Sequence, residues 1–222
     1  MAEKETEFLP YKVIYKPGTG FYEEKKSRFI AYVSPASSEE EAVSFIDSIK
    51  KKHYDARHNC FAYVIGENNE LQRCSDDGEP SQTAGRPMLD VLEGMGVHDV
   101  VAVVTRYFGG TLLGTGGLVR AYSAAMKEGL ADCVLLSQET GYRLQILTDY
   151  NDVGKLQYLS RTRQLHELSC EYADDVRMER LVPETEIDAV ETEITEKTSG
   201  KAKLERAEKL QYGLRDGQVV LL

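Results

Sequence analysis

The segment from residue 100 to residue 122 constrains the fold of this chain more than any other feature. It opens with a run of β-branched and small apolar residues, 100–104, which is typical of a strand buried on both faces of a sheet. Glycines recur between residues 109 and 117, where they permit positive φ angles and close backbone contacts. Apolar residues at helical spacing follow from Leu118. The segment therefore predicts a buried strand, a tight loop and the start of a helix.

A loop of this kind can gather several backbone amides at one point, and a helix N-terminus adds partial positive charge beside them. Arg106 ends the strand and Arg120 lies in the first helical turn, so both can reach the same space. Alternatively, the glycines only make a tight crossover and both arginines pair with surface carboxylates. The spacing matches neither a Walker loop nor the Gly-x-Gly-x-x-Gly dinucleotide fingerprint. The residues of this segment that we expect to bind phosphate or nucleic acid are Arg106, Gly109, Gly110, Thr111, Gly114, Thr115, Gly116, Gly117 and Arg120.

Asp76, Asp77 and Glu79 place three carboxylates around one glycine. Oxygen ligands of this kind suit a hard cation such as magnesium, but the same residues make a good turn, and the calcium-loop spacing is absent. We therefore predict a turn and no metal site. The carboxylates of this acidic loop could face arginines across a groove and hold them in place while the groove is empty.

Three further residues extend the candidate surface: Arg57, His58 and Arg86. His58 could act as a general base, or donate to a phosphate or a base edge, and it could equally be a structural hydrogen-bonding residue. Tyr107 and Phe108 could offer stacking faces for an unpaired base. They could also seal the core beneath the glycine loop, which is the interpretation we favour for Phe108.

The composition excludes a generally basic nucleic-acid binder, because the 222 residues carry a net charge of −10 and the pI is near 5.0. Any contact with RNA must come from a local cluster of arginine and lysine. The four cysteines show neither Cys-x-x-Cys nor zinc spacing, so we expect free thiols, with Cys60 in the core. The acidic, polar N-terminus does not resemble a signal peptide, and no apolar run is long enough to span a bilayer. We expect a cytoplasmic protein without a membrane partner.

In the first half of the chain, the residue pattern predicts a sheet with flanking helices. Ser38 and Glu41 form a capping-box pattern that starts a helix. Residues 17–20 are typical of a turn between an initial antiparallel pair of strands. The predicted elements are strands at 11–15 and 28–33, a helix at 38–52, strands at 59–65 and 71–74, a short helix at 86–93, and the strand and helix of the glycine-rich segment.

The pattern changes near residue 137, so we predict two domains, 1–136 and 137–222. The second has the order β-α-β-β-α-β, the split βαβ unit of the ferredoxin-like fold. Asp152 is expected to cap its first helix and Pro183 to open its second. Its strands are expected near 142–146, 165–172, 176–182 and 203–212. We find no chemical motif in this half, where Arg161 and Arg163 simply end a helix. We therefore interpret the second domain as an interaction or positioning module.

Three segments together, 55–63, 75–89 and 100–122, resemble the IMPACT family, whose bacterial members are of the YigZ type. The resemblance implies an α+β protein whose N-terminal domain has the fold of ribosomal protein S5 domain 2, shared with domain IV of elongation factor G. It implies a ferredoxin-like C-terminal domain similar to the C-terminal domain of that factor. Eukaryotic members are regulators of the translational stress response, but the additional RWD domain that they carry is absent from this sequence. The resemblance brings no catalytic residues and no cofactor.

We therefore expect a non-enzymatic, translation-associated protein that binds RNA or a ribosomal surface through its N-terminal domain. An enzyme or binding protein for a phosphorylated small molecule or nucleotide is the alternative, since fold relatives include kinases with a glycine-rich phosphate loop. A protein-interaction adaptor is a third hypothesis, suggested by the acidic surface.

Overall fold

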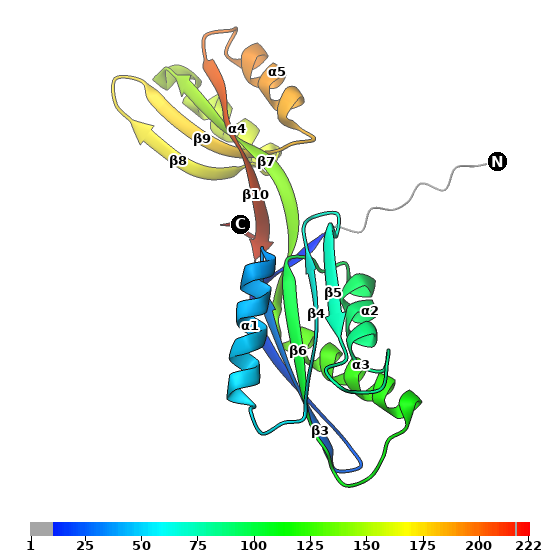
Figure 1. Cartoon of the computed structure of the whole chain (residues 1–222). Helices are drawn as coiled ribbons and strands as arrows, with labels where there is room; N and C mark the ends of the chain where they lie inside the picture. The colour runs from blue at the N-terminus through cyan, green and yellow to red at the C-terminus, as the bar shows by residue number, and fades with distance from the viewer. Residues whose placement is uncertain (1–10, 216) are drawn as a thin grey trace, which may run out of the picture. The chain divides into compact units, whose positions relative to one another are not determined.

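A computed structural model describes residues 11–215 and 217–222 of the chain (Figure 1). The chain divides between Ser137 and Gln138 into two compact units, and each unit is described by itself. Strand β7 (Val134–Thr148) runs from the first unit into the second. Among the described residues, no helix combines the length and apolar character that a membrane crossing requires.

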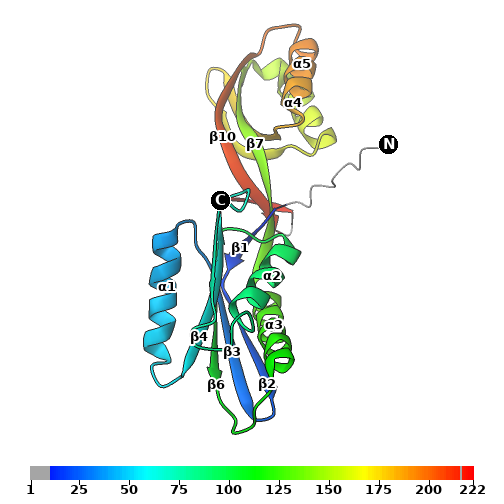
Figure 2. The same ribbon diagram turned by 45° about the vertical axis from the view of Figure 1, so that its right-hand side comes forward.

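Unit 1 is built on a five-stranded antiparallel sheet in the order β2-β3-β6-β4-β5. The central strand is the predicted one, and its residues 100–104 are fully buried. Helix α1 covers one face of the sheet, and α2 and α3 cover the other (Figure 2). The elements are β1 (Lys12–Lys16), β2 (Gly18–Glu24), β3 (Ser27–Pro35), α1 (Glu39–Lys52), β4 (His58–Ile65), β5 (Leu71–Ser75), α2 (Gly85–Met95), β6 (Val100–Tyr107) and α3 (Thr115–Asp132).

The first strands pair differently from the prediction. β1 pairs with the start of β7, not with β3, and residues 18–20 lie inside β2 instead of forming a turn. The glycines serve a close approach to α3: a Cβ on Gly20 would lie 2.3 Å from the backbone nitrogen of Gly129. The hairpin turn falls at Lys25 and Lys26, which both have positive φ.

Helix α1 begins as predicted, because Ser38 is its N-cap and accepts a hydrogen bond from the Glu41 backbone nitrogen at 3.2 Å. The reciprocal bond of the capping box goes one residue further out. The Glu41 carboxylate accepts from the backbone nitrogen and the hydroxyl of Ser37. Helix α2 also begins close to its predicted position, with Pro87 in its first turn.

Unit 2 has the predicted order of strands and helices around a sheet ordered β11-β10-β7-β9-β8. Apolar side chains of both helices pack with Leu144, Ile146 and Met178 of the sheet, so both cover the same face (Figure 2). Besides β7, the elements are α4 (Tyr150–Thr162), β8 (His166–Tyr172), β9 (Val176–Pro183), α5 (Ile187–Lys197), β10 (Lys203–Arg215) and β11 (Gln218–Leu221).

Two expected helix starts in unit 2 were wrong. Asp149, not Asp152, is the N-cap of α4, since its carboxylate accepts from the backbone nitrogens of Asn151 and Asp152. Pro183 ends strand β9, and α5 begins only at Ile187. Strand β11 was not predicted.

Candidate functional site

A cleft of about 400 Å³ opens in unit 1 where strands β4 and β6, the acidic loop and the start of α3 meet. His58 begins β4 and lies opposite Arg106 near the end of β6, so the antiparallel register brings them together. The cleft is lined by Arg57, His58, Glu79, Pro80, Arg106, Phe108, Leu112, Leu113, Gly114, Thr115 and Leu118.

A buried ion pair lies at this cleft. The Arg106 Nη1 atom donates to Glu79 Oε1 at 2.7 Å, and the two side chains are only 7% and 3% exposed. The Tyr122 hydroxyl donates to the same carboxylate oxygen at 2.9 Å. Burial raises the pKa of Tyr122, so its hydroxyl remains protonated and keeps donating. The acidic loop thus holds an arginine in place, as the sequence suggested, through Glu79.

The remaining face of the Arg106 guanidinium is apolar and aromatic. Its central carbon lies 5.5 Å from the Phe29 ring centre and 5.6 Å from that of Phe108. The buried Nε atom has no hydrogen-bond partner among the described residues. One donor of this buried side chain is therefore unsatisfied at the cleft.

The N-terminus of α3 borders the same cleft and carries no capping side chain. Its N-cap, Gly114, has φ +71°, a left-handed conformation that glycine adopts without strain. The first turn of α3 contains no acidic residue, so its free backbone amides are not neutralised locally. The glycine-rich segment therefore supplies an uncapped helix start at Gly114 and Thr115. Because α3 begins at Thr115, Arg120 lies in its second turn and not in the first, as the sequence had predicted.

His58 is half-buried and presents one ring nitrogen for a ligand. Its Nδ1 lies 2.9 Å from the carbonyl oxygen of Asp77. Because a carbonyl only accepts, Nδ1 carries the proton in this contact, and the neutral ring has a free lone pair on Nε2. The structure gives Nε2 no partner among the described residues, so it can accept a hydrogen bond from a ligand.

The acidic loop serves mainly to hold unit 1 together. Asp76 accepts three backbone bonds, from Gln82, Ala84 and Gly85, and so occupies the N-terminus of α2. Asp77 accepts from the Asn59 backbone nitrogen at 2.7 Å and meets Lys50 at 3.4 Å. Within the described residues no cluster of metal-ligating side chains is found. The turn interpretation thus describes what these carboxylates do in the structure.

The structure brings some of the predicted site residues together and leaves others apart. Gathered at the cleft are Arg57, His58, Glu79, Arg106, Gly114 and Thr115. Arg86 pairs with Asp90 and Glu93 on its own helix and does not line the cleft. The Gly109 amide donates to the Ser27 hydroxyl and so is committed to the fold. The others outside the lining are Asp76, Asp77, Gly110, Thr111, Gly116, Gly117 and Arg120.

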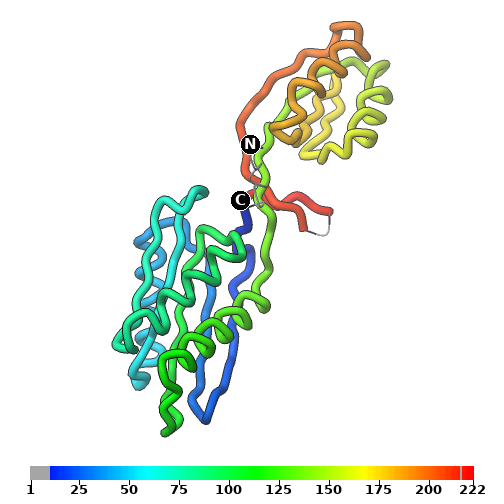
Figure 3. Tube along the Cα trace, turned by 90° about the vertical axis from the view of Figure 1, so that its right-hand side faces the viewer, coloured from blue at the N-terminus to red at the C-terminus, as the bar shows by residue number. Residues whose placement is uncertain are grey.

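A group of basic side chains surrounds this end of the sheet, and we call it the cationic end. The β2–β3 turn lies beside the loop after β6, where Gly109 contacts Lys26 and Ser27 (Figure 3). The C-terminus of α1 reaches the same end, since His53 hydrogen-bonds to Tyr107. The members, none of which forms an ion pair with a residue that the structure describes, are Lys25, Lys26, Arg28, Lys51, Lys52, Arg57 and Arg120.

Four carboxylates at the cationic end are occupied internally, whereas exposed Glu23 lies opposite Arg28 in the β2–β3 pairing. Asp55 accepts from the Tyr107 hydroxyl, and Glu24 accepts from the Tyr22 hydroxyl. Asp77 and Glu79 are held by Asn59 and Arg106. The chain is acidic overall, yet this end presents unpaired cations around a cleft.

Sequence reasoning missed two parts of this site. Phe108 was expected to seal the core, but it is 52% exposed and lines the cleft. The strand ends at Tyr107, and Phe29 and Leu118 already fill the core beneath the loop. Lys25 and Lys26 were missed because the turn was placed at residues 17–20. The pair of lysines between two alternating strand patterns was the signal that could have located it.

Comparison with known proteins follows the division into units. Residues 25–130 match the Impact N-terminal domain, and residues 146–201 match a domain of unknown function, DUF1949. The IMPACT family member YvyE of Bacillus subtilis is 45% identical over 83% of this chain and 85% of its own length. An IMPACT family member of Haemophilus influenzae is 38% identical over 88% of this chain and 97% of its own.

Other relatives match in part. YigZ of Escherichia coli is 46% identical over 60% of this chain and 64% of its own length. The mouse Protein IMPACT is 36% identical over 50% of this chain and 35% of its own length. The crystal structure of a hypothetical protein, 34% identical, superposes with a TM-score of 0.55 over 89% of this chain and 97% of that one. This chain therefore belongs to the IMPACT family, in the two-domain form of its YigZ-type members.

Proposed function

We propose that this protein is a non-enzymatic, translation-associated regulator that binds single-stranded RNA, free or on a ribosomal surface, through the cationic end of unit 1. The observation that supports this most is the set of unpaired cations around the cleft in a chain of net charge −10. Such a cluster would contact phosphates, and the acidic remainder would limit non-specific affinity.

The residues of the cleft and of the surrounding cationic end have distinct roles in this proposal. Exposed Arg57 and Arg120 contact phosphates, with the lysines of the β2–β3 turn beside them. The free amides at Thr115 bind a phosphate at the start of α3. Arg106 is already paired with Glu79, so it positions the site rather than carrying a phosphate.

The apolar wall gives a reason to prefer a single strand. Phe108 and Leu112 are 52% and 82% exposed beside the cleft. An exposed ring next to a cationic groove is a stacking surface for an unpaired base. The free Nε2 of His58 could bond to a ribose hydroxyl or a base edge.

The fold assignment implied by the family resemblance belongs to the same proposal. In unit 2 the strand order β10-β7-β9-β8, with both helices on one face, supports the ferredoxin-like fold. We assign unit 1 to the fold of ribosomal protein S5 domain 2. Both assignments would relate the chain to proteins that work on RNA.

A phosphorylated small molecule is a second candidate, favoured by one observation. The cleft of about 400 Å³ lies within the roughly 300–1,000 Å³ typical of small-ligand sites, and it combines apolar walls with an uncapped helix N-terminus. A nucleoside monophosphate would place its phosphate at Thr115 and its base against Phe108.

The experiment measures binding of a short fluorescent oligouridylate by anisotropy over a series of salt concentrations. The variant is the double charge reversal Arg57→Glu/Arg120→Glu. Arg106→Glu is avoided because it would bury two carboxylates together. We expect wild-type affinity to fall with salt, and the variant to bind about tenfold or more weakly, with a salt slope smaller by about 0.7 for each lost contact.

The matched control is Arg73→Glu/Lys127→Glu, which makes the same charge change on exposed residues of β5 and α3 that belong neither to the cleft nor to the cationic end. Equal loss in both variants would mean that only net charge matters and would refute the site. Uridine monophosphate is titrated in parallel. Saturable nucleotide binding with no RNA affinity would establish the second candidate, and sedimentation of lysates with ribosomal particles tests the cellular partner.

A further inference from the structure

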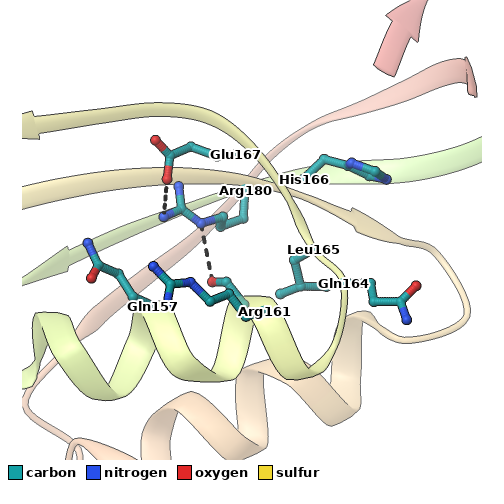
Figure 4. A pocket seen from close by; sticks show the side chains of 8 residues that line it. Gln157, Arg161, Gln164, Leu165, His166, Glu167 and Arg180 are labelled. Carbon is teal, nitrogen blue, oxygen red and sulfur yellow. Dashed lines mark hydrogen bonds and ion pairs between the residues drawn. The ribbon is translucent and has the colours of Figure 1, made fainter. Parts of the chain in front are cut away.

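The sequence suggested no chemistry in unit 2, but a pocket of about 390 Å³ lies between α4 and strands β8 and β9 (Figure 4). Arg180 lies at its base on β9, between Met178 and Val182, which face the helices. Its side chain is only 1% exposed. An arginine at a core-facing position is rare unless it is paired, so its partners decide what it does.

Hydrogen bonds fix one side of the Arg180 guanidinium, whereas a ligand could replace the partner on its other side. Its Nε donates to the Ser160 hydroxyl at 3.2 Å, and its Nη1 donates to the backbone oxygens of Ser169 and Glu179. These bonds fix the guanidinium plane. Among the described residues, its only ion pair is from Nη2 to Glu167 Oε2 at 2.7 Å, and the Glu167 side chain is 57% exposed.

A second arginine shares the pocket without any carboxylate of its own. Arg161 projects from the last turn of α4, and Figure 4 shows its guanidinium with Gln157, Glu167 and Arg180 around the same space. It forms no hydrogen bond or ion pair through its side chain with the residues that the structure describes. Two arginines thus share one exposed carboxylate, and the pocket carries an excess positive charge.

The backbone around the pocket is consistent with a binding site. The β8–β9 register shifts between Glu167 and Ser169, and such bulges often re-aim side chains at sites. The last carbonyls of α4 would repel an anion, but those of Leu159, Ser160 and Arg161 already accept backbone bonds from the residues that follow the helix.

We propose that this pocket binds the phosphate group of a small phosphomonoester, which takes the place of the Glu167 carboxylate on Arg180 and engages Arg161. A phosphomonoester carries about −1.5 to −2 charges and three acceptor oxygens at neutral pH, so it would neutralise both arginines where Glu167 neutralises one. Gln157 and His166 can bind the rest of the molecule, and the pocket volume suits a ligand of nucleotide size or smaller.

The test titrates the full-length protein with inorganic phosphate at slightly alkaline pH and follows amide and arginine Nε resonances by NMR. Saturable shifts are expected at Arg161, Glu167 and Arg180. Glu167→Gln removes the competing carboxylate and should tighten phosphate binding at least threefold. Arg161→Gln should weaken it about tenfold, and neither change removes a buried group.

Arg163→Gln is the control, because Arg163 lies at the same helix end but pairs with Glu186 and Glu193 outside the pocket. It should change the affinity less than twofold. Three results would overturn the proposal. The shifts could rise linearly with phosphate concentration, acetate could reproduce them at equal ionic strength, or they could be unchanged in Arg161→Gln. A Glu167→Gln variant that loses stability without binding phosphate more tightly would also overturn it, since the ion pair would then be structural. If the wild-type protein does not bind phosphate and Arg161→Gln loses RNA affinity, the proposal is wrong and the pocket binds RNA instead.

Discussion

In the part of the chain that the structure describes, each unit contains one buried arginine that pairs with a glutamate beside a cleft, and the two pairs differ in the exposure of the acid. In unit 1, Glu79 is 3% exposed and also holds the Tyr122 hydroxyl. In unit 2, Glu167 is 57% exposed and binds only Arg180 among the described residues. The N···O distance is 2.7 Å in both.

The two ion pairs therefore have equal N···O distances but different roles. Glu79 cannot leave Arg106 without stranding a buried charge and a buried hydroxyl, so that pair is a fixed part of the fold. Glu167 can turn into solvent at a smaller cost, because the acid itself is exposed and Arg180 keeps its bonds to Ser160, Ser169 and Glu179. The exposure of the carboxylate, rather than the contact itself, separates a structural pair from an exchangeable one.

The largest expected effect comes from removing the two acids in turn. Glu79→Ala should reduce the free energy of unfolding of unit 1 by about 3–5 kcal/mol, because it leaves Arg106 buried without a counter-charge. Glu167→Ala also leaves a buried arginine without a carboxylate, but Arg180 keeps three hydrogen bonds, so unit 2 should lose less, about 1–3 kcal/mol. Hydrogen exchange followed by mass spectrometry reports each unit separately through its own peptides. Equal costs for the two variants would erase the distinction between the pairs.

The next effect concerns the geometry of the cationic end at constant charge. A Cβ on Gly109 would lie 2.1 Å from the Lys26 backbone, so Gly109→Ala must push the β2–β3 turn away from the loop after β6. We expect a loss of about 1–3 kcal/mol in unfolding free energy and weaker RNA binding with an unchanged net charge. Thermal unfolding and anisotropy measure the two quantities.

Gly94→Ala is the matched substitution, because this glycine lies inside α2 with open space around it. The same change there should stabilise the protein by about 0.5–1 kcal/mol, since alanine favours a helix. A Gly109→Ala variant that behaves like Gly94→Ala would show that the turn and the loop move freely, and unit 1 would then lack a fixed binding surface.

Much of the framework was predictable because it follows from local patterns. The buried strand β6 and the start of α1 at Ser38 depend on apolar periodicity and capping, which neighbouring residues determine. The pairing of β1 with β7 joins residues more than 100 positions apart and leaves no local mark. Gly20 misled the prediction, because a glycine required by a close helix contact resembles a turn glycine.

The candidate sites were predictable to a different extent. The order of loop and helix in the glycine-rich segment could be predicted from local pattern, but the helix begins at Thr115, before the apolar spacing that starts at Leu118. The pairing of Arg106 with Glu79 could be suspected only as one of several arginine and carboxylate combinations. Arg180 gave no signal, since an arginine within an apolar strand becomes unusual only when its burial is known.

The smallest expected effect is a pH dependence in unit 1. His53 is buried beneath the cationic end, where the Tyr32 hydroxyl lies 2.8 Å from Nε2 and the Tyr107 hydroxyl 2.9 Å from Nδ1. Tyr107 donates to Asp55, so it accepts from Nδ1, and Nε2 accepts from Tyr32 in the neutral ring. The neutral ring is fully bonded, and a proton on Nε2 would meet the Tyr32 hydroxyl.

Burial, and then the charge of Lys52, lower the pKa of His53 in the folded protein. The unfolded chain consequently binds the proton more readily, and stability falls as the pH drops from about 6.5 towards the folded pKa. Each unit of pKa difference contributes about 1.4 kcal/mol, so this effect is small beside the loss of Glu79. Denaturant unfolding of wild type and His53→Gln at several pH values measures it, and the variant should lose this slope. Tyr32→Phe keeps the ring buried and should retain the slope. Loss of the slope would mean that the Tyr32 hydroxyl, rather than burial, keeps His53 neutral. The protonation state of His53 in unit 1 would then depend on a single contact, as the ion pairing of Arg180 does in unit 2.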